Sequence, residues 1–300
     1  MISDAQLFEA RQRLAGRLRL TPVMRVAPGL WFKLEYLQHT GTFKARGMLN
    51  RVLAGAPDKR SGVVIASGGN AGLAAAWAAG LAEVPIEVFV PENAPPVKVA
   101  KLRSLGATVV LKGAEYADAY DAAMKRMAET GAIYCHAYDQ PEVVAGAGTL
   151  GLELLEQVEE PTTIVVAVGG GGLMAGVASA VQNSALKDKA VVGVEPYNAP
   201  TLHAALDAGK PVDVKVEGIA ADSLGARRLG DIAFEVATRT GVRSVLVSDD
   251  DIVAARRELW EKYRILVEHG AAAAYAGYRP AKDERTVIVL CGANTDPAHS

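Results

Sequence analysis

Short apolar runs rich in β-branched residues alternate with alanine-rich segments along most of the chain, and this alternation strongly limits the folds open to it. Such runs, bounded by glycine or proline, are typical of buried strands, and the alanine-rich segments are typical of helices. Regular alternation of the two predicts parallel βαβ units and an α/β fold. The expected strands are 63–66, 86–90, 108–111, 164–168, 191–194, 244–247 and 286–290, with helices at 70–79, 98–105, 118–130 and 173–181.

These strands fall into two groups along the chain. The strands from residue 63 to 111 follow one another closely, and those from residue 164 onward form a second group. At about 150 residues per domain, 300 residues suffice for two domains. We therefore expect two open, mainly parallel α/β domains, a small one at 53–139 inserted into a large one made of 1–52 and 140–300.

Charge and hydropathy exclude several classes of partner. The 32 basic and 34 acidic residues nearly balance and form no long block of one sign, which argues against nucleic acid or an anionic membrane as a partner. The uncharged stretches 61–82 and 161–186 contain glycine-rich backbone that a lipid-facing helix would leave without partners, so no membrane span is expected. No secretory signal is visible, and Cys135 and Cys291 form no disulfide framework, which predicts a cytoplasmic protein.

Four consecutive glycines lie between the expected strand 164–168 and the expected helix 173–181: Gly169, Gly170, Gly171 and Gly172. Glycine lets backbone amides approach an anion closely, and the start of a helix adds positive charge. A tight turn requires only one or two glycines, so the run predicts a phosphate site. It matches neither a Walker loop nor the Rossmann fingerprint.

A second junction of strand and helix begins at Ser67 and runs through Gly68, Gly69, Asn70 and Ala71. Its free amides suit a carboxylate, although Ser67 or Asn70 could equally serve only as the helix cap. Two anion sites in one chain suggest a phosphorylated cofactor and a substrate that carries a carboxylate.

Lys44 and Cys291 are the remaining candidates for chemistry. Lys44 lies in a turn-rich segment, TGTFKARG, and a lysine in a dry pocket has a lowered pKa and can form a Schiff base with an aldehyde. Cys291 follows the expected strand 286–290, at the strand end where open α/β sheets bind ligands. The alternatives are an ordinary surface lysine and a buried structural cysteine.

In this order, TGTFKARG, SGGNAG, AGAGTLGLEL, VGGGGLMAG, VEPYNA and CGAN resemble the fold-type II pyridoxal phosphate enzymes, whose architecture is that of the tryptophan synthase β-subunit. The threonine/serine dehydratase and serine racemase family is the most similar, and the resemblance extends over residues 21–294. It implies pyridoxal 5'-phosphate as cofactor, a hydroxy amino acid as the small-molecule substrate, a homodimer, and the short form of the enzyme without a regulatory domain.

The resemblance also implies roles for single residues. Lys44 would bind the cofactor covalently and then act as the base at the substrate Cα, with Phe43 packed near the ring and Asn70 bonded to its phenolic oxygen. Cys291 would face the ring nitrogen as a neutral partner, which favours loss of a β-leaving group over transamination. The phosphate would be bound by Gly169, Gly170, Gly171, Gly172 and Leu173. The substrate carboxylate would be bound by Ser67, Gly68, Gly69, Asn70 and Ala71.

Two departures from the family pattern affect function. Gly68 stands where the racemases have a serine that donates a proton, so dehydration is favoured over racemisation. Glu195 and Ala199 match ligands of the metal site found in some members, but Thr201 replaces its aspartate, so no metal is expected. Glu195 would then be a solvated or interface carboxylate.

Two further positions concern the surroundings of the ring. Ser223 replaces the usual glycine of a loop beside the ring and adds a side chain there. Glu268 matches a family glutamate near the cofactor, although an exposed carboxylate at a helix end is the commoner role for such a residue.

The leading hypothesis is a pyridoxal-phosphate-dependent ammonia-lyase that converts L-threonine or L-serine to a 2-oxo acid and ammonia by β-elimination. Racemisation, or elimination from a related β-substituted amino acid, is the alternative on the same scaffold. A nucleotide-binding, dehydrogenase-like module and a non-catalytic amino-acid sensor are the alternatives from other classes.

Overall fold

The computed structural model of the chain describes residues 2–184, 190–281 and 284–295. Three limits used in the sequence analysis lie outside the described residues: Met1 and Ser300, which bound the expected large domain, and Leu186, which ends the second uncharged stretch. Within the described ranges the strands form one six-stranded and one four-stranded sheet, so the predicted α/β class is confirmed.

The six-stranded sheet has the order β1-β2-β10-β7-β8-β9. All neighbouring strands are parallel except β1 and β2, which form an antiparallel pair at one edge. The strands are β1 (Val23–Ala27), β2 (Leu30–Lys33), β7 (Thr163–Ala167), β8 (Ala190–Pro196), β9 (Arg243–Val247) and β10 (Thr286–Val289).

The four-stranded sheet has the order β5-β4-β3-β6 and is parallel throughout. It consists of β3 (Val63–Ala66), β4 (Ile86–Val90), β5 (Thr108–Leu111) and β6 (Ile133–Tyr134). Sequence analysis missed β6 because two residues are too few to show a period, and it missed β1 and β2 because charged residues interrupt their apolar runs.

Both faces of the inner strand β3 are buried, which explains its uninterrupted apolar run. Val63 and Ile65 of β3 pack in one buried cluster with residues of α3 (Asn70–Leu81). Val64 and Ala66 point the other way and pack in another cluster with residues of α5 (Tyr116–Thr130). Successive strand residues thus serve opposite faces.

The remaining helices are α1 (Asp4–Leu14), α2 (Lys44–Gly55), α4 (Pro96–Ser104), α6 (Pro141–Gln157), α7 (Gly172–Gln182), α8 (Thr201–Ala208), α9 (Asp231–Thr240), α10 (Asp249–Tyr263) and α11 (His269–Ala276), with short 3-10 turns at Glu35–Leu37 and His39–Gly41. Two expected helices begin two residues earlier than predicted. Pro96 begins α4, since proline is favoured in a first helical turn, and the Glu115 side chain caps α5.

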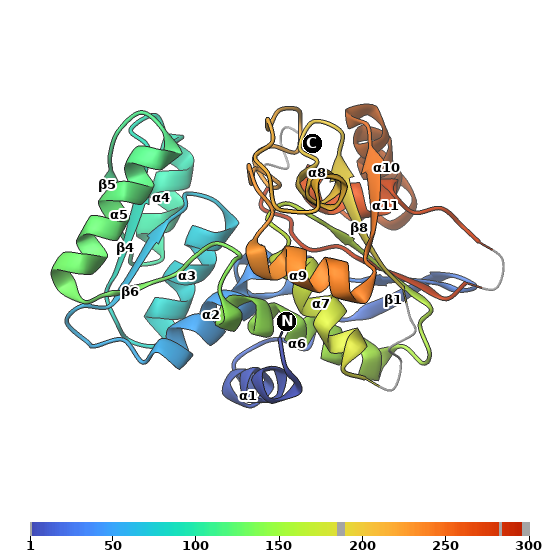
Figure 1. Cartoon of the computed structure of the whole chain (residues 1–300), viewed down its shortest axis with the longest axis horizontal. Coiled ribbons are helices and arrows are strands. Elements are labelled where there is room, and N and C mark those ends of the chain that lie inside the picture. The colour runs from blue at the N-terminus through green and yellow to red at the C-terminus, as the bar shows by residue number, and fades with distance from the viewer. Residues whose placement is uncertain (1, 185–189, 282–283, 296–300) are drawn as a thin grey trace.

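Figure 1 shows two lobes, with α3, α4 and α5 around the four-stranded sheet on the left and α7 to α11 on the right. The strands of each sheet come from one of the two groups expected from sequence, together with the strands that were missed. We propose 53–139 as the small domain, inserted between 1–52 and 140–300.

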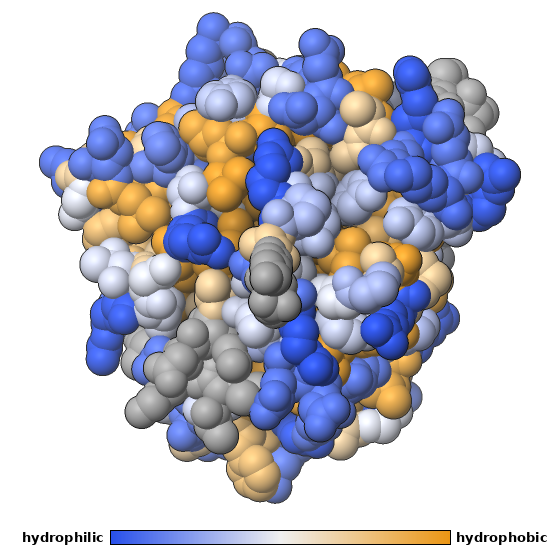
Figure 2. Space-filling model, turned by 90° about the vertical axis from the view of Figure 1, so that its right-hand side faces the viewer, coloured by the Kyte–Doolittle hydropathy of each residue, from blue (hydrophilic) through white to orange (hydrophobic). Residues whose placement is uncertain are grey.

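On the face of the right-hand lobe drawn in Figure 2, hydrophilic and apolar side chains are intermixed. Among the residues that the structure describes, no helix is both long and apolar enough to cross a bilayer.

Candidate active site

A pocket of about 610 Å³ is lined by residues that both sheets and their following loops supply. Seven of the predicted site residues line it: Lys44, Ser67, Gly69, Asn70, Ala71, Gly169 and Gly170. The other predicted residues are not part of its lining: Phe43, Gly68, Gly171, Gly172, Leu173 and Cys291. The pocket volume is in the ordinary range for small-molecule sites.

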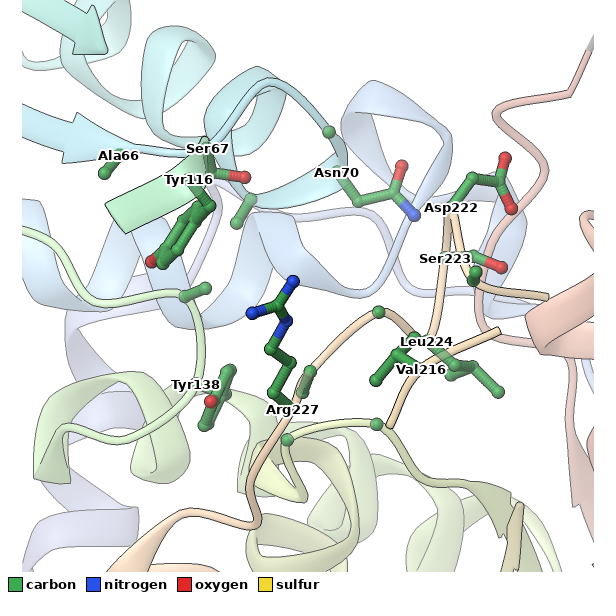
Figure 3. A pocket seen from close by; sticks show the side chains of 18 of the residues that line it. Ala66, Ser67, Asn70, Tyr116, Tyr138, Val216, Asp222, Ser223, Leu224 and Arg227 are labelled. Atoms are coloured by element: carbon green, nitrogen blue, oxygen red, sulfur yellow. The ribbon is translucent and has the colours of Figure 1, made fainter. Parts of the chain in front are cut away.

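Several lining residues were not predicted from sequence, and Figure 3 shows Tyr116, Tyr138, Val216, Asp222 and Arg227 among them. Tyr138 follows β6, the strand that sequence analysis missed. The others lie at the start of a helix or in the long segment between α8 and α9, where no strand end marks them. An assignment of β6 would have drawn attention to Tyr138 alone.

Lys44 is the first residue of α2, not part of a turn as expected from its glycine-rich surroundings. The turn ends just before it, where Thr40 and Gly41 adopt positive φ angles of 61° and 71°. From there the chain pairs with the segment after β10, since the Phe43 amide donates to the Cys291 carbonyl at 2.9 Å. This pairing brings Lys44 close to Cys291.

The Lys44 amine is held at the pocket wall. Its Nζ donates to the Ala137 carbonyl at 2.8 Å and lies 4.9 Å from the centre of the Phe43 ring. Burial lowers the pKa of Lys44 to about 8, although the negative charge of Glu268 acts in the opposite direction. An amine with this pKa is partly neutral at physiological pH and can act as a nucleophile or a base.

Cys291 is buried, and burial raises the pKa of its thiol far above the ordinary value. The thiol therefore stays protonated and neutral at physiological pH.

Asn70 is held by groups from the other lobe. Its Nδ2 lies 2.8 and 3.1 Å from the two carboxylate oxygens of Glu268, and its Oδ1 accepts from Asn294 Nδ2 at 2.7 Å. Glu268 is only 6% exposed, so the expectation of an exposed carboxylate was wrong. It does stand at a helix end, as the N-cap residue of α11, and burial raises its pKa.

The glycine run forms the turn between β7 and α7. Gly171 has a φ of +87°, which side chains rarely adopt, and a Cβ at Gly170 would lie 2.3 Å from the Tyr138 ring. The amides at the start of α7 have no partner within the helix, and they are close to the pocket wall formed by Gly169 and Gly170. The backbone here is suited to bind an anion.

Glu195, at the end of β8, is connected to the same turn through the Thr201 side chain. It is fully buried, so the expectation of a solvated carboxylate was wrong. It accepts from the amides of Leu202 and His203 at 2.7 and 2.9 Å, and Thr201 Oγ1 lies 2.9 Å away. The Thr201 hydroxyl also donates to the Gly169 carbonyl at 2.5 Å, so it joins Glu195 to the glycine run.

In the described part of the chain, no group of three His, Cys, Asp or Glu side chains is arranged to hold a metal ion. Ser223 lines the pocket, and its Oγ accepts from the Gly270 amide at 3.0 Å, which satisfies one of the free donors at the start of α11.

These groups fit a phosphorylated aldehyde. A poised amine at Lys44 can bind the aldehyde, and the amides around Gly169 and Gly170 can bind the phosphate. The neutral thiol of Cys291 fits an unprotonated ring nitrogen. Together with two mainly parallel α/β lobes, they define an enzyme of the fold-type II pyridoxal phosphate class.

Comparison with known proteins agrees with this class. Residues 6–292 match the family described as pyridoxal-phosphate dependent enzyme, and the chain belongs to this family. This membership favours pyridoxal phosphate over the nucleotide considered above as an alternative ligand of the glycine run.

Two curated relatives and one solved structure show the extent of the similarity. The L-threonine ammonia-lyase of Geobacter sulfurreducens is 38% identical over 99% of this chain and 76% of its own length. The phenylserine dehydratase of Ralstonia pickettii is 38% identical over 96% of this chain and 92% of its own length. The structure of maize serine racemase superposes with a TM-score of 0.91 at 31% identity, covering 99% of this chain and 95% of that one.

Proposed function

We propose that the protein is a pyridoxal-phosphate-dependent ammonia-lyase that converts L-threonine or L-serine to a 2-oxo acid and ammonia by β-elimination. The observation that carries the proposal is the Lys44 amine, with a pKa of about 8, in a pocket that also contains two amide-rich turns suited to anions. The names of the two curated relatives, an ammonia-lyase and a dehydratase, support the same chemistry.

We assign binding roles on this basis. The amides of the 169–173 turn hold the cofactor phosphate, and those of the 67–71 turn hold the substrate carboxylate at the start of α3. We assign the phenolic oxygen of the cofactor to Asn70, whose side chain is fixed in the pocket wall by Glu268 and Asn294. Phe43 packs beside the ring, and the neutral Cys291 thiol faces its nitrogen.

Lys44 carries the proton transfer. When bound, pyridoxal phosphate withdraws electrons from the substrate Cα and makes its proton acidic. The neutral Lys44 amine accepts that proton, and the β-hydroxyl group leaves as water after it takes up a proton near the phosphate site. Burial keeps the Lys44 pKa near the working pH, which is the condition for an effective base.

Racemisation is disfavoured at Gly68, which has no hydroxyl to donate a proton from the opposite face. A serine placed there would bring its Cβ to 3.1 Å from Val90 Cγ1, tighter than most contacts. The similarity in fold to maize serine racemase therefore does not by itself imply racemase activity, because this chain has no side-chain hydroxyl at position 68.

We also propose that the protein is a cytoplasmic homodimer. The resemblance to the dehydratases supports both the dimer and the location. Sedimentation of the purified protein would test the dimer.

Incubating the purified holoenzyme with L-threonine and with L-serine, and assaying the 2-oxo acid and ammonia, tests the function. We expect equal amounts of both products and none from Lys44→Ala. If no hydroxy amino acid gives a 2-oxo acid, the proposal is wrong.

A further inference from the structure

Arg227 extends into the pocket from the segment between α8 and α9. Here the chain runs beside itself, because the Val214 amide donates to the Arg227 carbonyl at 2.8 Å and Asp213 pairs with Arg228. Neighbouring side chains of extended backbone point to opposite sides. Arg228 accordingly approaches Asp213, with Nη1 and Oδ1 3.9 Å apart, whereas Arg227 is directed toward Ser67 and Asn70 (Figure 3).

Two acidic residues line the pocket, Glu115 and Asp222. The Glu115 side chain accepts from the backbone at the start of α5. Asp222 lies on the far side of Asn70 from Arg227 (Figure 3), where its charge acts on Glu268 and His269. Among the ion pairs formed by the described residues, none includes Arg227.

Arg227 is therefore a cation without an assigned anion. The proposed function places the cofactor phosphate on the 169–173 turn and the substrate α-carboxylate on the 67–71 turn, and both sites consist of backbone amides. A third anion, on the substrate side chain, would match the Arg227 guanidinium, which extends into the pocket (Figure 3). Arginine is well suited to this, since its planar group binds a carboxylate through two parallel hydrogen bonds.

We propose that Arg227 selects a β-hydroxy amino acid whose side chain ends in a carboxylate, an inference that rests on the proposed ammonia-lyase function. The reaction remains a β-elimination. The Cα–H and Cβ–O bonds break, and water leaves. The resulting enamine tautomerises to an imine, which takes up one water and releases ammonia and a 2-oxo diacid. No oxidant or reductant is required.

The first experiment compares substrates on the wild-type holoenzyme, using the diastereomers of 3-hydroxyaspartate as probes beside L-serine, L-threonine and phenylserine. We expect kcat/KM for one 3-hydroxyaspartate isomer to exceed that for L-serine by about 10- to 100-fold, the factor expected of a hydrogen bond to a charged group. Succinate, which cannot react, should also bind more tightly than butyrate in calorimetry.

The second experiment removes the guanidinium. Arg227→Gln should abolish the preference for 3-hydroxyaspartate and for succinate, while kcat/KM for L-serine stays within about threefold. Arg227→Lys should retain part of the preference, since it keeps the charge but loses the planar fork. The matched control is Arg239→Gln, on the exposed end of α9, where Arg239 pairs with Glu235; it should change none of these values.

The outcomes separate this inference from the proposed function. Turnover of L-serine or L-threonine without a preference for 3-hydroxyaspartate overturns the role of Arg227 and leaves the ammonia-lyase intact. A weaker affinity of the Arg227→Gln apoenzyme for pyridoxal phosphate would assign the guanidinium to the cofactor instead. A preference for phenylserine that depends on Arg227 would point to an aromatic side chain, and it would also overturn the inference.

Discussion

Asn70 and Glu268, 198 residues apart in sequence, are joined by hydrogen bonds of 2.8 and 3.1 Å from one amide nitrogen to both carboxylate oxygens. Asn294 donates to the amide oxygen of Asn70 from the other end. Because both ends of the amide are engaged, its orientation is fixed before any ligand binds. The contact also links the start of α3 in one lobe to the start of α11 in the other.

Replacing Glu268 should therefore disturb Asn70. We expect Glu268→Ala to lower kcat/KM by about 10- to 100-fold and to shift the absorbance of the bound cofactor, because the Asn70 amide loses its acceptor. Glu268→Gln retains an acceptor oxygen and should lose less activity. Absorbance spectra and steady-state kinetics of both variants measure this. Equal losses in the two variants would mean that the charge matters and the orientation does not.

The lowered pKa of Lys44 predicts how cofactor attachment depends on pH. A cationic group with a depressed pKa is neutral at lower pH than usual, so about a tenth of the amine is neutral at pH 7. The rate at which the apoenzyme binds pyridoxal phosphate covalently should rise about tenfold per pH unit below pH 8 and level off above it. Stopped-flow absorbance measures this rate. A rise that continues to pH 10 would show that Lys44 keeps an ordinary pKa.

The Thr201 hydroxyl bridges Gly169 and Glu195, so its removal should loosen the phosphate turn. We expect Thr201→Val to raise the dissociation constant for pyridoxal phosphate about tenfold, because the Gly169 carbonyl loses its donor and the link to Glu195 is broken. Thr201→Ser retains the hydroxyl and is the control. Titration of each apoenzyme with pyridoxal phosphate, followed by absorbance, measures the dissociation constant. An unchanged affinity in Thr201→Val would show that the bridge has no role in cofactor binding.

Arg46 of α2, the helix that begins at Lys44, belongs to a buried cluster of charges. Arg46 Nε lies 2.6 Å from Glu35 Oε1, and its Nη2 lies 2.9 Å from Glu153 Oε2. Arg46 is therefore the cation that balances the charge of the buried Glu35 carboxylate. Arg46→Met should lower the free energy of unfolding by about 3–5 kcal/mol, since a carboxylate stays buried without its partner.

The control for Arg46 is Arg11→Met, which breaks an exposed pair with Glu156 and should cost under about 1 kcal/mol. Urea unfolding of both variants measures the difference. Similar midpoints for the two would contradict the importance of burial for the Arg46 cluster.

Gly68 predicts little racemisation. In the wild-type enzyme, D-serine formed from L-serine should be a small fraction of the pyruvate, as chiral chromatography can measure. Gly68→Ser should increase that fraction but lower stability, because the new Cβ crowds Val90, and adding Val90→Ala should restore stability. Equal D-serine and pyruvate from the wild type would show that another group donates the proton.

Much of the fold could be predicted because its central strands are buried on both faces. Val63 to Ala66 are all apolar for that reason, and a glycine-rich turn follows directly. The edge strand β1 and its neighbour β2 escaped prediction because Arg25 interrupts one apolar run and Lys33 ends the other. The buried Lys33 amine is paired with Glu153 and also donates to the Thr21 carbonyl and to Gln157. Such compensation by a distant partner leaves no local pattern.

The candidate site divides in the same way. Lys44, Asn70 and the 169–172 run could be identified because their chemistry lies in short segments, either as local glycine-rich turns or as motifs that resemble a known family. Glu268 was ranked low because its burial depends on residues far away in sequence, and Arg227 and Tyr138 were missed because irregular segments carry them into the pocket.

The sequence by itself determined the alternating α/β class, the two anion-binding turns and the candidate lysine, because each depends on residues adjacent in the chain. Only the tertiary structure decided that Glu268 holds Asn70, that Thr201 joins Glu195 to Gly169, and that Arg227 reaches the pocket. These relationships depend on how the lobes and loops pack, and burial then sets the pKa of the groups that they bring together.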